Sequence, residues 1–202
     1  MIGILDYGLG NVRAFSNIYN ELNVPCRVVS CENDMVDVRK FILPGVGAFD
    51  WAMKKFLTKD FVQSVLDKVL VKNFPILGVC VGMQMMLARS EEGSHDGFGW
   101  IQGQVQKFQL PEKPVLRLPH MGWNTVVNNP DHPLFEGIQN TNFYFLHSYF
   151  VNIENNDMAI AHTHYGTSFC SAFAQKNVMG VQFHPEKSHD QGVQLLKNFA
   201  DI

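Results

Sequence analysis

The stretch ILGVCVGMQ, residues 76–84, places a cysteine between two glycines directly after an apolar run. Residues 76–79 are typical of a buried strand and residues 83–88 of a helix, so Cys80 is expected at a tight strand-to-helix turn. Glycines on both sides avoid side-chain collisions across such a bend. The helix N-terminus adds partial positive charge and free backbone amides, which favour a thiolate and can hold an oxyanion. The stretch therefore predicts a nucleophile at the carboxyl edge of a sheet.

Strand-like and helix-like runs alternate on the N-terminal side of this stretch. The strand-like runs are short and apolar, at 1–6, 26–29 and 41–43. The helix-like runs have apolar residues at helical spacing, at 12–22, 49–56 and 61–71. This alternation predicts parallel βαβ units, and so an α/β fold with a central, mostly parallel sheet and helices on both faces.

The C-terminal half has a different pattern. Its runs are short and β-like, at 105–108, 142–146, 158–162 and 178–183, and predict a mixed or antiparallel extension of the sheet. An amphipathic run at 191–200 predicts a last helix. Because no linker or low-complexity tract interrupts the chain, we expect one domain over residues 1–202.

Composition excludes several functional classes. Of 202 residues, 46% are hydrophobic and 17% are charged, which is ordinary for a protein that buries a full core. The 16 basic and 19 acidic residues give a net charge of −3 and the basic ones are dispersed, so a nucleic-acid partner is not expected. Without a signal-peptide pattern or a membrane-length apolar run, the chain is expected in the cytoplasm. The four cysteines lack CxxC spacing, which argues for reduced, mostly buried thiols and against a zinc site.

A thiolate nucleophile needs a base, and VQFHPE at 181–186 offers one directly after a strand. His184 and Glu186 are two residues apart, so in an extended segment both would face the same side. The carboxylate could then hold the tautomer of the imidazole as the third member of a triad. The alternatives are an ordinary strand-ending His-Pro turn with a solvated glutamate, and a Cys80 that is merely a small buried residue.

A third glycine-rich segment, LPGVG at 43–47, follows another predicted strand. Its glycines would let backbone amides turn toward a substrate oxygen as an oxyanion hole. An ordinary Pro-Gly turn is the competing interpretation.

The pair His162 and His164 could place two imidazoles on one strand face, but no further ligand accompanies it, so we expect an exposed strand pair. Residues 8–11, GLGN, form only half of a dinucleotide fingerprint and are expected to approach a partner instead.

Together these segments resemble a known family. The chain carries PGVGAF at 44–49, GVCVGMQ at 78–84, PHMGWN at 119–124, HSYF at 147–150 and GVQFHPEKS at 180–188. These look like the motifs of class I (triad) glutamine amidotransferases, whose fold is flavodoxin-like. DYGLGN at 6–11 and the PHMGWN segment resemble in particular the glutaminase subunits of imidazole glycerol phosphate synthases, enzymes of histidine biosynthesis. The resemblance covers essentially the whole chain.

The resemblance implies a role for each matching residue. Cys80 would attack the glutamine amide to form a thioester, His184 would move the protons, and Glu186 would orient His184. For the oxyanion hole and substrate binding it implies Gly45, Gly47, Val81, Gln84, His147, Ser148 and Tyr149. For contact with a partner it implies Asn11, Trp123, Asn124, Tyr144 and Lys187. One departure is Val81, where the family usually has leucine, although the swap keeps the backbone amide.

The resemblance also implies a partner and no cofactor. Ammonia would pass to a (β/α)₈ cyclase subunit, in a heterodimer that makes imidazole glycerol phosphate and an aminoimidazole carboxamide ribotide. We expect weak glutaminase activity alone and activation when the partner orders residues 45–47. Three rivals stay open at this point: the same chemistry feeding another synthase, such as one for sugar amidation in polysaccharide synthesis; a cysteine hydrolase or peptidase with a related turn; and a non-enzymatic interaction subunit.

Overall fold

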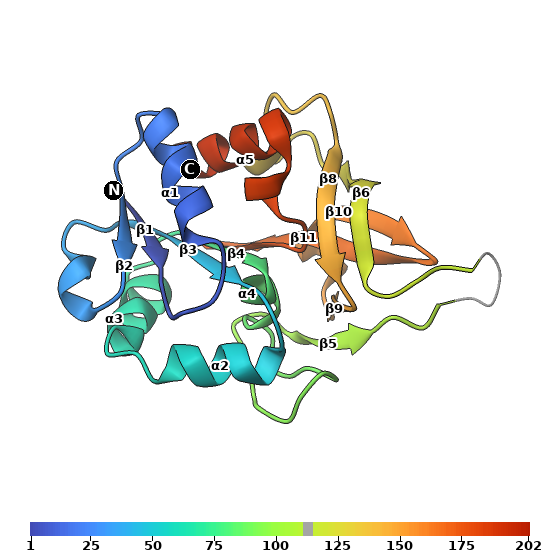
Figure 1. Ribbon diagram of the computed structural model, residues 1–202, viewed down its shortest axis with the longest axis horizontal. Coiled ribbons are helices and arrows are strands. Elements are labelled where there is room, and N and C mark those ends of the chain that lie inside the picture. Colours follow the sequence, from blue (N-terminus) through green and yellow to red (C-terminus); the bar gives the residue numbers. More distant parts are fainter. Residues whose placement is uncertain (111–114) are drawn as a thin grey trace.

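A computed structural model of the protein describes residues 1–110 and 115–202 (Figure 1). Within these residues, ten strands form one mixed sheet. Its path runs β2-β1-β3-β4-β12-β11-β10-β7, with β9 and β5 branching from β11, and a separate ribbon pairs β6 with β8. The predicted α/β class and the mixed C-terminal extension are confirmed.

The parallel part of the sheet is built from short, buried strands. These are β1 (Ile2–Leu5), β2 (Cys26–Val29), β3 (Lys40–Gly45), β4 (Ile76–Cys80) and β12 (Val178–Val181), in which β1 pairs with β2 and β3, and β4 pairs with β3 and β12. The strands β1, β4 and β12 are buried throughout, because helices cover both faces.

The helices lie on both sides of this sheet, as predicted. In Figure 1, α1 (Val12–Glu21) and α5 (His189–Asp201) cover one face, and α2 (Phe49–Leu57) and α3 (Val62–Leu66) cover the other. Each long helix turns one apolar stripe inward: α1 buries Phe15 and Tyr19, and α5 buries Leu195, Leu196 and Phe199.

The antiparallel part comes from the C-terminal half. It contains β5 (Gly103–Lys107), β7 (Val127–Asn128), β9 (Tyr149–Ile153), β10 (Ala159–Tyr165) and β11 (Thr167–Gln175), and the ribbon consists of β6 (His120–Thr125) and β8 (Asn142–His147). The ribbon stands beside the end of the sheet (Figure 1). One face of the ribbon is buried and the other faces outward, which matters for the site below.

Two expectations were wrong in detail. The helix predicted over 83–88 is α4 (Val81–Gln84), which ends after one turn. The carbonyls of residues 85–88 then accept hydrogen bonds from the amides of residues 97–101 instead of continuing the helix. The stretch 61–71 is not one α-helix, because α3 ends at Leu66 and a π-helical turn, Asp67–Val71, follows.

The position of β12 determines the site. Although β12 is about 100 residues beyond β4 in sequence, it lies directly beside β4, with Val181 opposite Val79. On the other side of β4, Gly45 of β3 lies opposite Cys80. The chain leaving β12 and the chain leaving β3 therefore flank the end of β4, where Cys80 lies. Parallel strands end at one edge of a sheet, which is where such folds place their sites.

Candidate active site

Cys80 sits at a strained turn between β4 and α4. Its backbone has φ +54° and ψ −111°, an unusual conformation for a residue other than glycine. The flanking glycines are required by close packing, since a Cβ on Gly78 would lie 2.7 Å from Gly82 O and one on Gly82 would lie 1.9 Å from Leu43 O. The predicted strand-to-helix turn is confirmed. It holds the thiol at the first turn of α4, where backbone amides are free.

His184 and Glu186 are in contact. His184 Nδ1 lies 2.9 Å from Glu186 Oε1, and both side chains are only 2% exposed. The reason for the contact differs from the expected one, because the segment is not extended: Pro185–Lys187 forms a 3₁₀ turn that brings the carboxylate to Nδ1 of the ring. Since a carboxylate only accepts, Nδ1 carries the proton of the neutral ring. His184 Nε2 is then left as a base.

The charge state of His184 is coupled to that of its neighbours. Burial by itself lowers the pKa of the imidazole, but the adjacent Cys80 thiolate and the Glu186 carboxylate outweigh this effect and raise the pKa to about 10. His184 Nε2 is buried and has no hydrogen-bond partner among the described residues. His184 Nε2 is therefore free to receive the proton of the Cys80 thiol, and the negative charges of the thiolate and of Glu186 hold that proton on the imidazole once it has moved.

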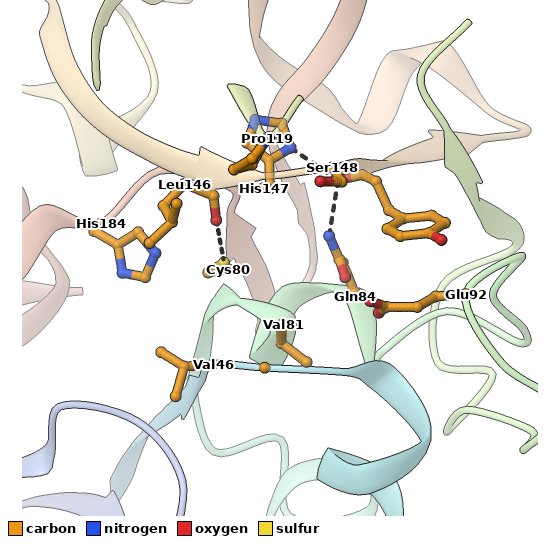
Figure 2. A pocket seen from close by; sticks show the side chains of 12 residues that line it. Val46, Cys80, Val81, Gln84, Glu92, Pro119, Leu146, His147, Ser148 and His184 are labelled. Carbon is orange, nitrogen blue, oxygen red and sulfur yellow. Dashed lines mark hydrogen bonds between the residues drawn. The ribbon is translucent and has the colours of Figure 1, made fainter. Parts of the chain in front are cut away.

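These groups open onto a pocket of about 250 Å³ (Figure 2). It brings together eight of the residues singled out from the sequence: Gly47, Cys80, Val81, Gln84, His147, Ser148, Tyr149 and His184. In Figure 2, His184 lies at one end, Glu92 lies at the other, and Cys80 lies between them. The volume suits a small metabolite of amino-acid size rather than a peptide chain.

Glu92 was missed from the sequence. Of the side chains that line the pocket in the described part of the chain, it is the one carboxylate. Its Oε2 accepts a hydrogen bond of 2.9 Å from the backbone amide of Phe49, at the start of α2. Burial raises its pKa, although the bond from Phe49 opposes that effect. No local signal in the sequence marks Glu92, because Glu91-Glu92 in a turn-rich segment is typical of a solvated pair.

Of the three candidates for the oxyanion hole, Gly47 and Val81 line the pocket and Gly45 does not. Gly47, with φ +87° and space around its α-carbon, lines the pocket together with Val81. Gly45 instead packs against the start of α4: a Cβ there would lie 2.3 Å from the backbone nitrogen of Gly82. Gly45 is thus needed for close packing of β3 on α4, and it does not line the pocket.

The floor of the pocket is a buried hydrogen-bond network. The carbonyl of Tyr149 accepts from Gln84 Nε2 at 3.0 Å and from His147 Nδ1 at 2.8 Å. This leaves His147 Nε2 as the acceptor for His120 Nδ1 at 2.9 Å. Asn124 then donates to His120 Nε2 at 3.1 Å. The network is consistent only with two neutral rings, and burial lowers the pKa of His147 to about 3 and of His120 to about 4.

Three of the five partner candidates gather at the outer face of the ribbon, and the other two, Asn124 and Asn11, lie elsewhere. Trp123, which is 48% exposed, contacts Tyr144 edge to face, and Lys187 Nζ lies 5.7 Å from the centre of the Tyr144 ring. His189 stacks on Trp123 at 4.9 Å and was not singled out from the sequence. Asn124 lies on the opposite, inner face, where it also donates to the carbonyl of His164. Asn11 is exposed directly before α1.

The remaining polar candidates have ordinary positions. His162 and His164 are exposed on β10 with buried Thr163 between them, as expected for a strand-surface pair.

The described residues hold no group of three or more metal-binding side chains. All four cysteines are free, but Cys26 and Cys31 are half-buried rather than buried. None of the helices in residues 1–110 and 115–202 has the length and apolarity to span a membrane.

Known proteins match this chain over essentially its whole length. The glutamine amidotransferase class-I family profile matches residues 3–202. The imidazole glycerol phosphate synthase subunits HisH of Bdellovibrio bacteriovorus and Leptospira interrogans are each 46% identical over 205 residues, with 100% of both chains covered. Subunit HisH 2 of Pseudomonas aeruginosa is 39% identical over 203 residues, again with full coverage.

Solved structures agree in fold. A glutamine amidotransferase superposes with a TM-score of 0.74 at 15% identity, covering 100% of this chain and 99% of the other. One from Thermotoga maritima has a TM-score of 0.63 at 17% identity, covering 99% of this chain and 82% of the other. Because the family profile and the full-length relatives coincide, the chain belongs to the class-I glutamine amidotransferases, in the branch of the glutaminase subunits of imidazole glycerol phosphate synthase.

Proposed function

We propose that this chain, acting as one cytoplasmic domain, hydrolyses glutamine at Cys80 and delivers the ammonia to the cyclase subunit of an imidazole glycerol phosphate synthase. The observation that carries the proposal is the arrangement of one pocket: a cysteine on a strained turn, beside a histidine whose Nδ1 is held by a buried carboxylate and whose Nε2 is unoccupied in the described chain. This is the arrangement that cysteine-dependent acyl transfer requires.

The first half-reaction is acyl transfer to sulfur. His184 Nε2 takes the thiol proton, and the Cys80 sulfur attacks the side-chain amide carbon of glutamine to form a C–S bond. Backbone amides at Val81 and at Gly47, both on the pocket wall, are the candidates for stabilising the oxyanion. His184 then gives its proton to the amide nitrogen, the C–N bond breaks, and ammonia leaves behind a glutamyl thioester.

The second half-reaction returns the enzyme to its starting state. A water molecule gives a proton to His184 Nε2 and its oxygen attacks the thioester carbon. When the C–S bond breaks, the electron pair stays on sulfur, and His184 returns the proton. Glu186 holds the Nδ1–H tautomer throughout and stabilises the imidazolium that forms in each half-reaction. The products are glutamate and ammonia.

The charged end of the substrate has a matching partner at Glu92. If the carboxamide of glutamine is at Cys80, its α-ammonium group lies toward the far end of the pocket, where Glu92 supplies a carboxylate. Pairing of a partly buried carboxylate with an ammonium group selects an amino acid over a neutral amide. The backbone at Ser148 and Tyr149 lines the same region and is the candidate for binding the α-carboxylate.

The outer face of the ribbon is the proposed docking surface for the cyclase. Exposed Trp123, Lys187 and His189 form one cluster there with half-buried Tyr144, and Asn11 at the start of α1 is a further candidate. Exposed aromatic residues with a cation beside them are typical of binding hot spots. The relatives carry the name of the imidazole glycerol phosphate synthase subunit over their full length, so ammonia supply to another synthase is not favoured.

The test compares glutamate formation with and without a purified cyclase subunit and its nucleotide ligand, using Cys80→Ala as the blank. We expect weak activity alone and a strong, ligand-dependent increase, lost in Cys80→Ala, because ligand binding orders the segment at Gly47. Restored growth of a histidine auxotroph that lacks this subunit would support the pathway. Equal rates with and without the cyclase would overturn the partner assignment, and glutamine hydrolysis by Cys80→Ala would overturn the nucleophile.

A further inference from the structure

Gln182 is a fully buried side chain that the mechanism above does not use. It follows β12 directly, and the register of β12 on β4 places it beside Cys80, one position beyond the pair Val181 and Val79. Gln182 Nε2 lies 3.7 Å from Cys80 Sγ, within the range of a hydrogen bond to sulfur. Burying a carboxamide costs free energy unless its polar atoms form hydrogen bonds, so the partners of the Gln182 amide must lie inside the protein.

The orientation of the Gln182 amide follows from its neighbours. Gln84 Nε2 donates to the carbonyl of Tyr149, which can only accept, so the amide of Gln84 has one possible orientation. The second hydrogen of Gln84 Nε2 points to Gln182 Oε1 at 3.0 Å. Since Gln182 Oε1 is the acceptor in that bond, the NH₂ group of Gln182 must face the sulfur. A flipped Gln182 would place two NH₂ groups against each other.

We infer that Gln182 is a catalytic residue, which donates a hydrogen bond to the Cys80 sulfur and stabilises it as a thiolate, and that Gln84 positions Gln182 for this task. A hydrogen bond to an ionised acceptor is roughly twice as strong as one between neutral groups, so the bond strengthens as the thiol loses its proton. It also favours cleavage of the thioester, because the sulfur leaves carrying the electron pair. The inference rests on the proposed function in one respect, that Cys80 is the nucleophile.

This role differs from the one that the sequence suggested for Gln84. Both hydrogens of the Gln84 amide are used inside the protein, one by Tyr149 and one by Gln182. Gln84 still lines the pocket, but its NH₂ group is not free to donate to the substrate. Gln84 and Gln182 therefore connect the Tyr149 backbone, a substrate-binding candidate, to the Cys80 sulfur through successive hydrogen bonds.

The test measures the rate of alkylation of Cys80 by iodoacetamide as a function of pH, in the purified chain without glutamine. Peptide mass spectrometry follows Cys80 separately, because Cys26 and Cys31 are free and half-exposed and so are accessible to the same reagent. In Gln182→Met, which keeps the side-chain length and loses the donor, the midpoint of the profile should rise by about one pH unit, the size of a hydrogen bond to a charged group. Gln84→Met should raise it less, and the double variant no more than Gln182→Met.

The matched control is Gln191→Met, which removes another nearly buried glutamine whose amide bonds to Asn142 on a different part of the fold. Its midpoint should equal that of the native chain. A native midpoint in folded Gln182→Met, checked by circular dichroism, would overturn the inference and leave the proposed function intact. Slow, unselective alkylation of Cys80 in the native chain would overturn both. If Gln182→Met does not fold, the shift in Gln84→Met decides, and its absence overturns the inference.

Discussion

Glu186 Oε1 lies 2.9 Å from His184 Nδ1, although a proline separates the two residues in the chain. The contact depends on the 3₁₀ turn at Pro185–Lys187. It also depends on the position of the His184 backbone, whose amide donates a hydrogen bond to the carbonyl of Tyr144 at 2.8 Å. The hydroxyl of Ser188 adds a second tie, since it donates to His184 O at 2.6 Å. The base is thus held from three directions before any substrate arrives.

Replacing Glu186 by glutamine should lower kcat by roughly 10²-fold or more, because the amide can stabilise neither the Nδ1–H tautomer nor the imidazolium as a carboxylate does. KM for glutamine should change little, since Glu186 does not line the pocket. Steady-state glutaminase assays in the presence of the cyclase measure both constants. Glu21→Gln, an exposed change at the end of α1, is the control. A Glu186→Gln variant with native kcat would remove Glu186 from the triad.

Replacing Glu92 by glutamine should raise KM for glutamine by about tenfold and leave kcat close to native, because the lost charge pairs with the α-ammonium group rather than with the reacting carbon. Glu91→Gln is a matched control: it changes the neighbouring carboxylate, which bonds to the amide of Lys107 and does not line this pocket. An equal rise in KM for both variants would point to a general loosening of the segment, and would contradict the substrate contact.

Replacing Trp123 by alanine should weaken binding of the cyclase by at least about 30-fold, the cost that defines a hot-spot residue. The chain offers a close match for the control, since Trp51 on α2 is 47% exposed and has Lys55 Nζ at 4.7 Å from its ring. Trp51→Ala should leave the affinity unchanged. Titration calorimetry with the purified cyclase measures both, and a larger loss in Trp51→Ala would move the docking surface to α2.

Stability should fall in mild acid because of His120 and His147. The folded protein holds both rings neutral, with pKa values lowered to about 4 and about 3, whereas they take up protons near pH 6.5 in the unfolded chain. The stabilisation is complete above pH 6.5 and is lost as the pH falls below it, by about 1.4 kcal/mol per pH unit for each ring. Urea unfolding between pH 6.5 and 5 should show a shallower decline in His147→Asn, and a native decline in the exposed control His162→Asn.

The sequence was sufficient for the sheet, the nucleophile and the base, because these depend on local patterns. Apolar runs identify β4 and β12, and the two glycines around Cys80 mark a turn that allows no side chain. Strand pairing then brings the base to the nucleophile, because the residues that follow β12 must lie beside Cys80 once β12 pairs with β4 in parallel.

What the sequence could not supply depends on contacts between distant loops. Glu92 reaches the pocket because Asp50 accepts hydrogen bonds from the amides of Ser94 and His95 and so holds that loop against α2. The early end of α4 has the same character, since the carbonyls of residues 85–88 exchange helical partners for amides from a later segment. No periodicity in a single stretch reports such an exchange.

The central position of β12 also bears on how the protein is made. Strands β1 to β4 emerge from the ribosome long before β12, which lies between β4 and β11 in the finished sheet. Until residues 178–181 arrive, β4 is an open edge with unpaired backbone groups, the kind of surface on which incomplete chains aggregate. The same delay keeps Cys80 apart from its base, so that a truncated or half-made chain carries the thiol but not the means to consume glutamine.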